Sequence, residues 1–257
     1  MQMNYVSSLS GGAASAVAHW RAVKRYGKEN VTAWFADTQW EDDDLYRFLE
    51  DFENFIGQKI IRHSEGITPL DVAESQNIIP NQKIAPCSQV LKQKPFKKFI
   101  MSYEKPVTVL LGLDWSEQHR MIAPKKAYES IPYVSVDYPL MWKPYDFDVF
   151  QTVRDWGIEI PRLYKMGFPH NNCGGRCVRQ GIKEWQRLKV HFPERFAAVR
   201  DWEAAQQSIG DARKDYAIAR DQSGGEVKPL SLADIEEREF ANDEAIQEDL
   251  FACFCSY

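Results

Sequence analysis

The sequence predicts an α/β fold: a five-stranded, mainly parallel sheet, doubly wound by helices and followed by a helical C-terminal extension. Up to Leu140, strand-like segments alternate with helix-like ones, which is typical of parallel strands joined by crossover helices. Within this region Val107-Thr108-Val109-Leu110-Leu111 is apolar or β-branched without alternation, as in a central strand buried on both faces.

The expected strands are short runs rich in apolar and β-branched residues: Asn4–Leu9, Val31–Phe35, Lys59–Arg62, Pro106–Leu113 and Tyr133–Val136. Helices are expected where apolar residues recur at near-helical spacing: Ala13–Tyr26, Glu41–Ile56, Asp146–Trp156, Arg179–Val190 and Pro193–Gln207. Residues 161–168 are predicted to be irregular.

Beyond Gly210 the helical periodicity fades, and Ser223-Gly224-Gly225 is typical of a hinge. Residues 234–249 are acid-rich with Arg238 as the only basic side chain, which indicates a solvated helix or a disordered tail. We therefore expect a domain over residues 1–207 and an acidic, partly flexible tail over 208–257 that ends in Cys-x-Cys.

Composition excludes few classes of function. The 257 residues carry a formal net charge of −5, which neither requires nor excludes a nucleic-acid partner. No apolar run approaches the roughly 18 residues of a membrane span, and the first residues lack a signal segment, so we expect a cytoplasmic protein without membrane contact. Five cysteines in that compartment favour metal binding or thiol chemistry over disulfides.

The stretch Ser7-Ser8-Leu9-Ser10-Gly11-Gly12-Ala13-Ala14-Ser15 places a glycine turn between the first strand and the first helix. The first N–H groups of a helix lack partners and its dipole is positive there, so an anion is stabilised. Glycines let the backbone approach a phosphate, and serine hydroxyls donate hydrogen bonds. The stretch predicts a phosphate site built from Ser8, Ser10, Gly11, Gly12 and Ser15; a plain glycine turn with a serine N-cap is the alternative.

From Asn4 to Glu203 the chain resembles the phosphoadenosine phosphosulfate (PAPS) reductase family within the PP-loop, or adenine nucleotide α-hydrolase-like, superfamily. Ser10-Gly11-Gly12-Ala13-Ala14-Ser15 is similar to the family's Ser-Gly-Gly-x-Asp-Ser loop, with Ala14 in place of the aspartate. In ATP-cleaving members that aspartate helps to hold Mg²⁺. The departure argues against ATP cleavage and leaves the anion cradle intact.

Three further segments carry the resemblance. Asp37-Thr38 with Glu41 resembles the Asp-Thr-x-x-Glu segment near the nucleotide base and ribose, and 112–117 with Arg120 resembles a segment that ends in the arginine of an oxyanion pocket. Residues 160–177 look like the stretch Pro-x-x-Tyr-x-x-Gly that leads to a cysteine pair, here C-x3-C. The resemblance and the local charges imply nucleotide contacts by Asp37, Thr38, Lys92, Gly112 and Arg176 and a catalytic role for Arg120.

The cysteines leave three alternatives open. Residues 87–95 resemble the Cys-Cys-x-x-x-Lys-x-x-Pro segment of iron–sulfur reductases, with Ser88 at the second cysteine position. The first alternative is a 4Fe–4S cluster on Cys87, Cys173 and Cys177 with Cys255 from the tail as fourth ligand. The second is zinc on Cys173, Cys177, Cys253 and Cys255, which leaves Cys87 as a nucleophile. The third is a set of metal-free thiols, with Cys253 or Cys255 as a mobile attacking thiol.

The resemblance implies an enzyme of sulfur chemistry with an adenine nucleotide, ATP or a sulfonucleotide (APS or PAPS), as ligand. The predicted reaction is reduction of a sulfonucleotide, with a thiol or sulfur donor or acceptor as the second partner. One alternative is nucleotide-dependent sulfur insertion into tRNA, DNA or a small molecule. Another is a non-catalytic nucleotide-binding protein with a zinc-stapled fold.

Overall fold

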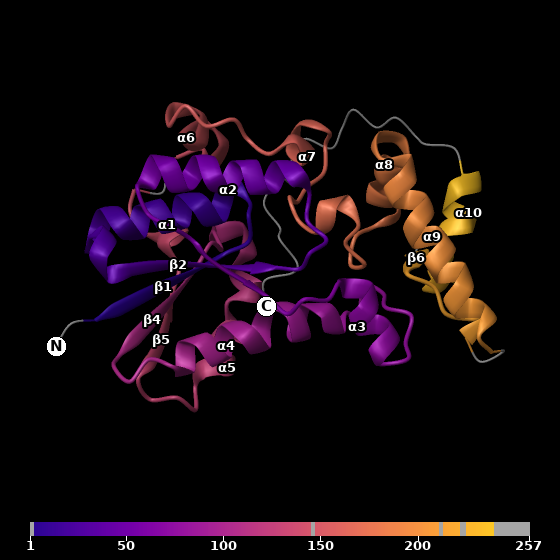
Figure 1. The fold of residues 1–257 in the computed structure, drawn as a ribbon, viewed down its shortest axis with the longest axis horizontal. Coiled ribbons are helices and arrows are strands. Elements are labelled where there is room, and N and C mark those ends of the chain that lie inside the picture. The colour runs from indigo at the N-terminus through magenta and orange to yellow at the C-terminus, as the bar shows by residue number, and fades with distance from the viewer. Residues whose placement is uncertain (1–2, 145–146, 211–212, 222–224, 239–257) are drawn as a thin grey trace.

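The computed structural model describes residues 3–144, 147–210, 213–221 and 225–238. Its main sheet has five strands, all paired in parallel, in the order β3-β2-β1-β4-β5 (Figure 1). The strands are β1 (Asn4–Leu9), β2 (Val31–Asp37), β3 (Ile61–Ser64), β4 (Val107–Leu111) and β5 (Val134–Asp137). The predicted five-stranded parallel sheet is confirmed, with β3 beginning two residues later than expected.

Helices cover both faces of this sheet (Figure 1). One face packs against α1 (Ala13–Tyr26), α2 (Asp43–Ile56) and α6 (Val149–Asp155) through a core that includes Phe35, Phe48 and Val153. The other packs against α4 (Lys94–Met101) and α5 (Ile122–Tyr128) through Trp34, Phe96 and other buried side chains. The doubly wound arrangement is thereby confirmed.

The strand order reverses between β1 and β4, because β2 follows on one side of β1 and β4 lies on the other. In open α/β sheets ligands bind outside the carboxyl ends of the strands at such a switch point. Here the loop 10–12 follows β1 and Gly112 follows β4. The switch point of the sheet therefore lies at the same loop that the sequence predicts to bind a phosphate.

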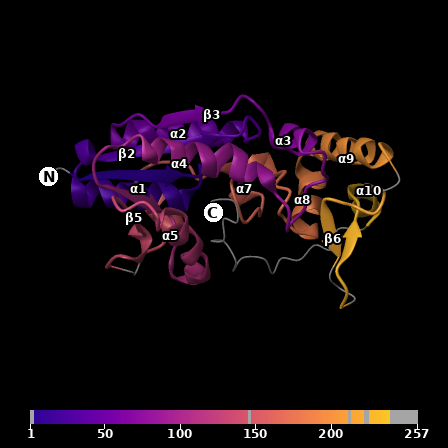
Figure 2. The same cartoon turned by 90° about the horizontal axis from the view of Figure 1, so that it is seen from below.

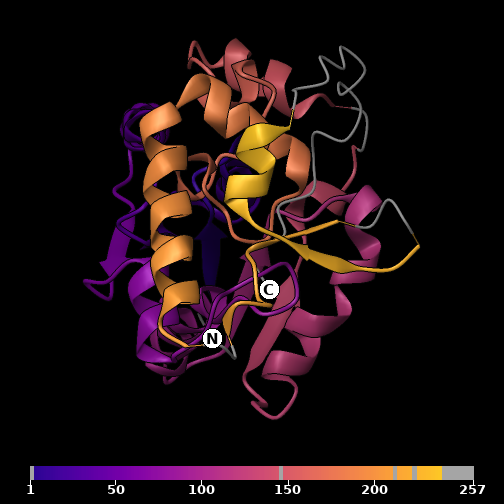
Figure 3. The same cartoon turned by 90° about the vertical axis from the view of Figure 1, so that its right-hand side faces the viewer.

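A second hydrophobic core lies beyond the sheet, at the other end of the molecule (Figure 2). It is formed by side chains such as Trp185, Phe196 and Ile235 and by elements around them: α3 (Pro69–Ser75), α7 (Arg162–Lys165), α8 (Ile182–His191), α9 (Pro193–Ser208), β6 (Ala219–Asp221), β7 (Lys228–Leu230) and α10 (Leu232–Glu237). Figure 3 shows α10 beside α9, with the antiparallel pair of β6 and β7 extending away from α9.

These last elements depart from the sequence-based expectation. Periodicity does not reveal β6, β7 and α10, because they are only three to six residues long. Glu203 of α9, 1% exposed, accepts hydrogen bonds of 2.6 Å from the N–H groups of Ile218 and Leu232. Thus β6 contacts α8, and α10 contacts both α8 and α9. The division into domains at residue 207 stays a prediction.

Two local differences bear on the site. The segment 161–168, expected to be irregular, contains the short helix α7. Residues Ser88–Gln93, directly after Cys87, form a π-helical turn, a conformation that often marks functional sites. The remaining short helices are η1 (Lys28–Asn30), η3 (Trp115–Arg120), η4 (Pro139–Met141) and η5 (Cys173–Gly175). None of the helices in the described ranges is long and apolar enough to cross a membrane.

Candidate functional site

The loop between β1 and α1 leaves the N-terminus of a 14-residue helix without a cap. Gly12 occupies the N-cap position and provides no side-chain hydrogen bond. In the described part of the chain, the N–H groups of Gly11, Gly12, Ala13 and Ala14 donate no hydrogen bond. By contrast, α2 is capped by the carboxylate of Asp42. The uncapped N-terminus of a helix favours an anion, because its N–H groups lack partners and the helix dipole is positive there.

Two serines shape the loop from within. The N–H and the hydroxyl of Ser10 lie 3.1 and 3.2 Å from the hydroxyl oxygen of Ser15, which donates to the carbonyl of Gly12 at 2.9 Å. The Ser15 hydroxyl therefore holds the turn in shape, a role that adds to the phosphate contact expected for it. Ser8 is half-buried in β1, opposite Leu111 of β4.

Glycine is required at the points where other elements approach the loop. Gly11 has a φ of +79°, and a Cβ there would lie 2.6 Å from the side chain of Leu45. A Cβ on Gly12 would lie 2.6 Å from the hydroxyl of Tyr164, and one on Gly112 would lie 2.9 Å from the Cα of Ser15. The first turn of α1 is thus enclosed by β4 on one side and by Tyr164 on another.

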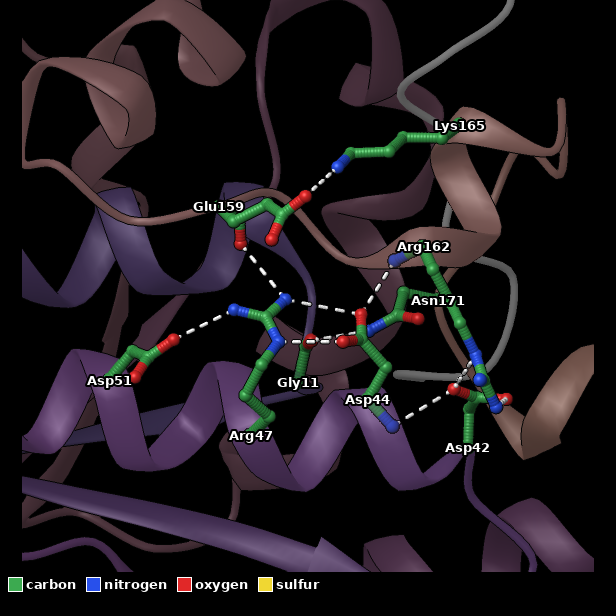
Figure 4. A network of polar contacts seen from close by, with 9 residues as sticks. All are labelled: Gly11, Asp42, Asp44, Arg47, Asp51, Glu159, Arg162, Lys165 and Asn171. Atoms are coloured by element: carbon green, nitrogen blue, oxygen red, sulfur yellow. Dashed lines mark hydrogen bonds and ion pairs between the residues drawn. The ribbon is translucent and has the colours of Figure 1, made fainter.

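The segment that carries the cysteine pair is bonded to this loop. The side-chain amide of Asn171 donates to the carbonyl of Gly11 at 2.8 Å in a buried contact (Figure 4). In the described residues, Asn171 Oδ1 and Asn172 Nδ2 are buried without a hydrogen-bond partner. Neither asparagine was among the predicted site residues, although both lie in the segment that carries the family resemblance. Their contact with the loop spans 160 residues, beyond the reach of local sequence patterns.

A buried carboxylate fixes α7 and α9 against the start of α2. Asp42, with a fully buried side chain, accepts hydrogen bonds from Arg162 at 2.7 and 2.9 Å and from Arg195 at 2.6 Å. Burial raises the pKa of Asp42, but the hydrogen bonds from the two arginines outweigh it and the pKa lies below its ordinary value. Asp44 accepts from the backbone N–H of Arg162 and from Arg47 (Figure 4). The network holds the segment that leads to Asn171.

Cys87, Cys173 and Cys177 line one small cavity together with Thr38 and Lys92. Cys87 is half-buried, whereas Cys173 and Cys177 are buried. No disulfide joins them to one another in the part of the chain that the structure describes. The structure therefore brings together the three cysteines predicted to converge, next to two of the predicted nucleotide-binding residues.

Glu41 organises one wall of this cavity. Its carboxylate, with a fully buried side chain, accepts hydrogen bonds from the hydroxyl of Thr38 at 2.9 Å and from the backbone N–H of Cys173, and lies 3.7 Å from the ammonium of Lys92. Cys173 has a φ of +52°, a conformation that non-glycine residues rarely adopt. The end of β2, the π-helical turn and the cysteine loop thus meet at one carboxylate.

A metal does not fit the cysteines that the structure describes. Within these ranges no group of three or more Cys, His, Asp or Glu side chains is placed to hold a metal ion. The cavity measures about 10 Å³, the space of about one water molecule. Cys253 and Cys255, expected as a fourth iron ligand, as zinc ligands or as nucleophiles, lie outside the described residues.

The predicted cations differ in what they contact. Arg176 donates to the carbonyl of Trp40 at 2.7 Å and lies over its ring at 4.5 Å, and burial lowers its pKa to about 10. Arg120 pairs with the buried carboxylate of Glu117, and burial raises the pKa of Glu117 in spite of that partner. Burial, together with Arg120, lowers the pKa of His170 to about 4. Arg120 therefore lies near the segment of Asn171.

Asp37, at the end of β2, accepts hydrogen bonds from the hydroxyl of Tyr46 at 2.7 Å and from the N–H of Gln39 at 2.8 Å. Burial and then Asp37 raise the pKa of Tyr46. The carboxylate thus lies at the carboxyl edge of the sheet beside β1, where the open end of α1 also lies. Its proposed contact with a nucleotide stays a prediction.

Comparison with known proteins supports the resemblance seen in the sequence motifs. Residues 4–214 match the phosphoadenosine phosphosulfate reductase domain. The uncharacterized protein MJ0066 of Methanocaldococcus jannaschii is 27% identical over 197 residues. The match covers 73% of this chain and 38% of that protein, so the chain spans well under half of the relative's length.

Proposed function

Since the chain belongs to the phosphoadenosine phosphosulfate reductase family, with the nucleotide-binding, sulfur-related role of that family, we propose that it reduces an adenine sulfonucleotide with its own cysteine thiols. The nucleotide phosphate binds the open N-terminus of α1. The sulfonyl group extends toward the cavity of Cys87, Cys173 and Cys177.

The observation that carries the proposal is the continuous set of contacts from the loop to the thiols. Four consecutive N–H groups from Gly11 to Ala14 have no partner in the described chain, so they favour an anion at that point. The carbonyl of the same loop is held by Asn171, two residues before Cys173. One segment of the chain, residues 171–173, therefore connects the proposed anion site to the cavity of the thiols.

The proposed reaction balances with two thiols of this chain. A cysteine thiolate attacks the sulfonyl sulfur, the S–O bond to the phosphate breaks, and AMP (or its 3′-phosphate form) leaves as an oxyanion. This forms Cys–S–SO₃⁻. A second thiol loses its proton and attacks the cysteine sulfur, which releases sulfite and forms a disulfide. The transferred sulfur is reduced from S(VI) to S(IV), and a dithiol reductant restores both cysteines.

Burial separates the roles of the three described cysteines. Cys87 is half-buried and precedes the π-helical turn, whereas Cys173 and Cys177 are buried. A nucleophile must reach the ligand, so Cys87 is assigned the first attack and the buried pair supplies the second thiol. The ammonium of Lys92 beside the cavity stabilises a thiolate or a sulfonate, because a nearby cation favours the charged form.

The groups near the loop favour binding of a sulfonucleotide over hydrolysis of ATP. Ala14 stands where ATP-cleaving relatives carry an aspartate, so this loop has no carboxylate for Mg²⁺ at that position. The buried amide of Asn172, which has no partner in the described residues, supplies a donor for an anionic oxygen. Arg120 supplies a second charge-assisted donor.

Binding is tested first, by thermal shift with adenosine, AMP, ATP, APS and PAPS. A ligand at 100 times its dissociation constant stabilises the folded protein by about 2.7 kcal/mol, which raises the melting temperature by roughly 5–10 °C. We expect this shift with APS or PAPS and none with adenosine, which has no phosphate. Equal shifts with adenosine and APS would contradict phosphate binding at α1.

Chemistry is tested separately, by single turnover without added reductant. We expect one sulfite per protein molecule and the loss of two titratable thiols per sulfite. Cys87→Ser should release no sulfite while keeping the thermal shift with the nucleotide. Sulfite release by this variant at the wild-type rate would remove Cys87 from the mechanism without affecting the binding proposal.

A further inference from the structure

A groove of about 800 Å³ lies along the C-terminal half of α1, between Trp20, Trp142 and Trp156. Its walls come from α1, the segment 142–144 and α6. The helices α1 and α6 lie on the same side of the sheet (Figure 1). From Ser15 to Lys24 the axis of α1 rises about 14 Å. The groove is therefore separate from the nucleotide loop, and the proposed reaction does not use it.

The groove is basic although the chain is acidic. Among its described lining residues, the cations are Arg21, Lys24, Arg25 and Lys143, against the single carboxylate of Asp155, whereas the whole chain has a formal net charge of −5. In the part of the chain that the structure describes, no carboxylate pairs with Lys24, Arg25 or Lys143, and all three are exposed. A concentration of unpaired positive charge in a concave surface attracts a polyanion.

Aromatic rings alternate with these cations. The guanidinium of Arg25 lies 4.5 Å from the ring centre of Trp142, that of Arg21 lies 4.6 Å from Phe147, and the ammonium of Lys24 lies 5.4 Å from Trp20. Arg21 also donates to the carbonyls of Trp142 and Pro144, so the segment is fixed to α1. Guanidinium planes and aromatic faces are the surfaces on which unpaired bases stack.

We propose that this groove binds a single-stranded nucleic acid, with the phosphates on the exposed cations and one or more bases stacked on the guanidinium and aromatic surfaces. An acidic peptide would match the charge but would leave the stacking surfaces unused. The observations therefore favour the polynucleotide. The site does not depend on nucleotide binding at the open end of α1.

The test measures anisotropy of fluorescein-labelled oligo(dT) and oligo(U) on the full chain between 50 and 200 mM salt. We expect binding of at least one of them, and the double variant Lys24→Glu, Arg25→Glu should weaken it about tenfold or more. Each phosphate contact contributes about 0.7 to the salt slope of a single strand, so losing two should reduce the slope by about 1.4.

The chain offers a matched control in Lys125→Glu, Lys126→Glu. Both pairs are exposed and lie in the last turn of a helix, and Lys125 also faces an aromatic ring, at 5.7 Å from Tyr138. The control should retain wild-type affinity, and both variants should keep the thermal shift with the sulfonucleotide. Absence of oligonucleotide binding, or equal loss in the two variants, would overturn the proposal.

Two further probes test what occupies the groove. An abasic oligonucleotide carries the same phosphates without bases, and we expect it to bind about tenfold more weakly; equal affinity would overturn base stacking. A synthetic peptide with the acidic sequence of residues 239–257 should not displace the oligonucleotide. Displacement at equal concentration would overturn the proposal in favour of an acidic peptide as the ligand.

Discussion

Gly112→Ala places one methyl group between β4 and the first turn of α1. The added Cβ would lie 2.9 Å from Ser15 Cα, 3.1 Å from Ser15 N and 3.3 Å from the carbonyl carbon of Ala14. All three atoms are backbone, so no side-chain rotation can relieve the overlap. Since ordinary contacts begin near 3.5 Å, the N-terminus of α1 must retreat by about 0.5 Å.

Overpacking of this kind costs about 1–3 kcal/mol of unfolding free energy, and each kcal/mol lowers the melting temperature of a chain of this size by roughly 2–4 °C. A binding site tolerates displacements of only about 0.5 Å, so we also expect the dissociation constant for APS or PAPS to rise about tenfold. Urea unfolding measures the loss of unfolding free energy, and calorimetric titration measures the dissociation constant.

Gly210→Ala is the control, because a Cβ there meets nothing within 4 Å. It should change neither quantity by more than a few tenths of a kcal/mol. If Gly112→Ala is folded and binds the sulfonucleotide with wild-type affinity, the positioning of α1 by β4 does not matter for binding and the reasoning is refuted.

Three other substitutions test the rest of the account. Burial lowers the pKa of His19 to about 4 in spite of its hydrogen bond with Gln58. The unfolded chain is therefore protonated first as the pH falls, so stability on the order of 3 kcal/mol is present above pH 6.5 and is lost toward pH 4. His19→Gln should flatten the pH dependence of the unfolding free energy, measured by urea unfolding across this range. Glu203→Ala leaves two buried N–H groups without acceptors and should lower the unfolding free energy by about 2–5 kcal/mol. Glu41→Gln removes the charge that joins Thr38, Lys92 and Cys173 and should speed the reaction of the cavity thiols with an aromatic disulfide severalfold.

Each of these three predictions has an outcome that contradicts it. If the unfolding free energy of His19→Gln depends on pH as in the wild type, the proton is taken up by another group. Glu203→Ala with wild-type stability would mean that β6 and α10 are not held by that carboxylate. Unaltered thiol reactivity in Glu41→Gln would show that the charge of Glu41 does not influence the cavity thiols.

The central sheet could be predicted because its signals are local. The bounds expected for β1 and α1, Asn4–Leu9 and Ala13–Tyr26, agree with the structure, since an apolar run, a glycine turn and a helical spacing follow one another without interruption. The resemblance in sequence motifs likewise identified the family, because each motif is a short run of residues that can be recognised without knowing the fold.

What sequence reasoning missed depends on distant contacts. The acidic side chain of Glu203 has the appearance of a solvated helix position, yet it is buried because β6 and α10 fold back onto α9. Arg176 was expected to contact the nucleotide. Its guanidinium contacts the carbonyl and the ring of Trp40, and these contacts depend on how the two loops meet in the fold. The bond between Asn171 and Gly11 joins residues 160 positions apart.

The central claim is that the open N–H groups at the start of α1 hold the phosphate of an adenine nucleotide. Amide nuclear magnetic resonance of the ¹⁵N-labelled protein, titrated with APS, tests it directly. We predict that the resonances of Gly11, Gly12 and Ala13 shift most, and that adenosine leaves them unchanged. If APS binds while these three amides keep their positions in the spectrum, the phosphate lies elsewhere and the account is wrong.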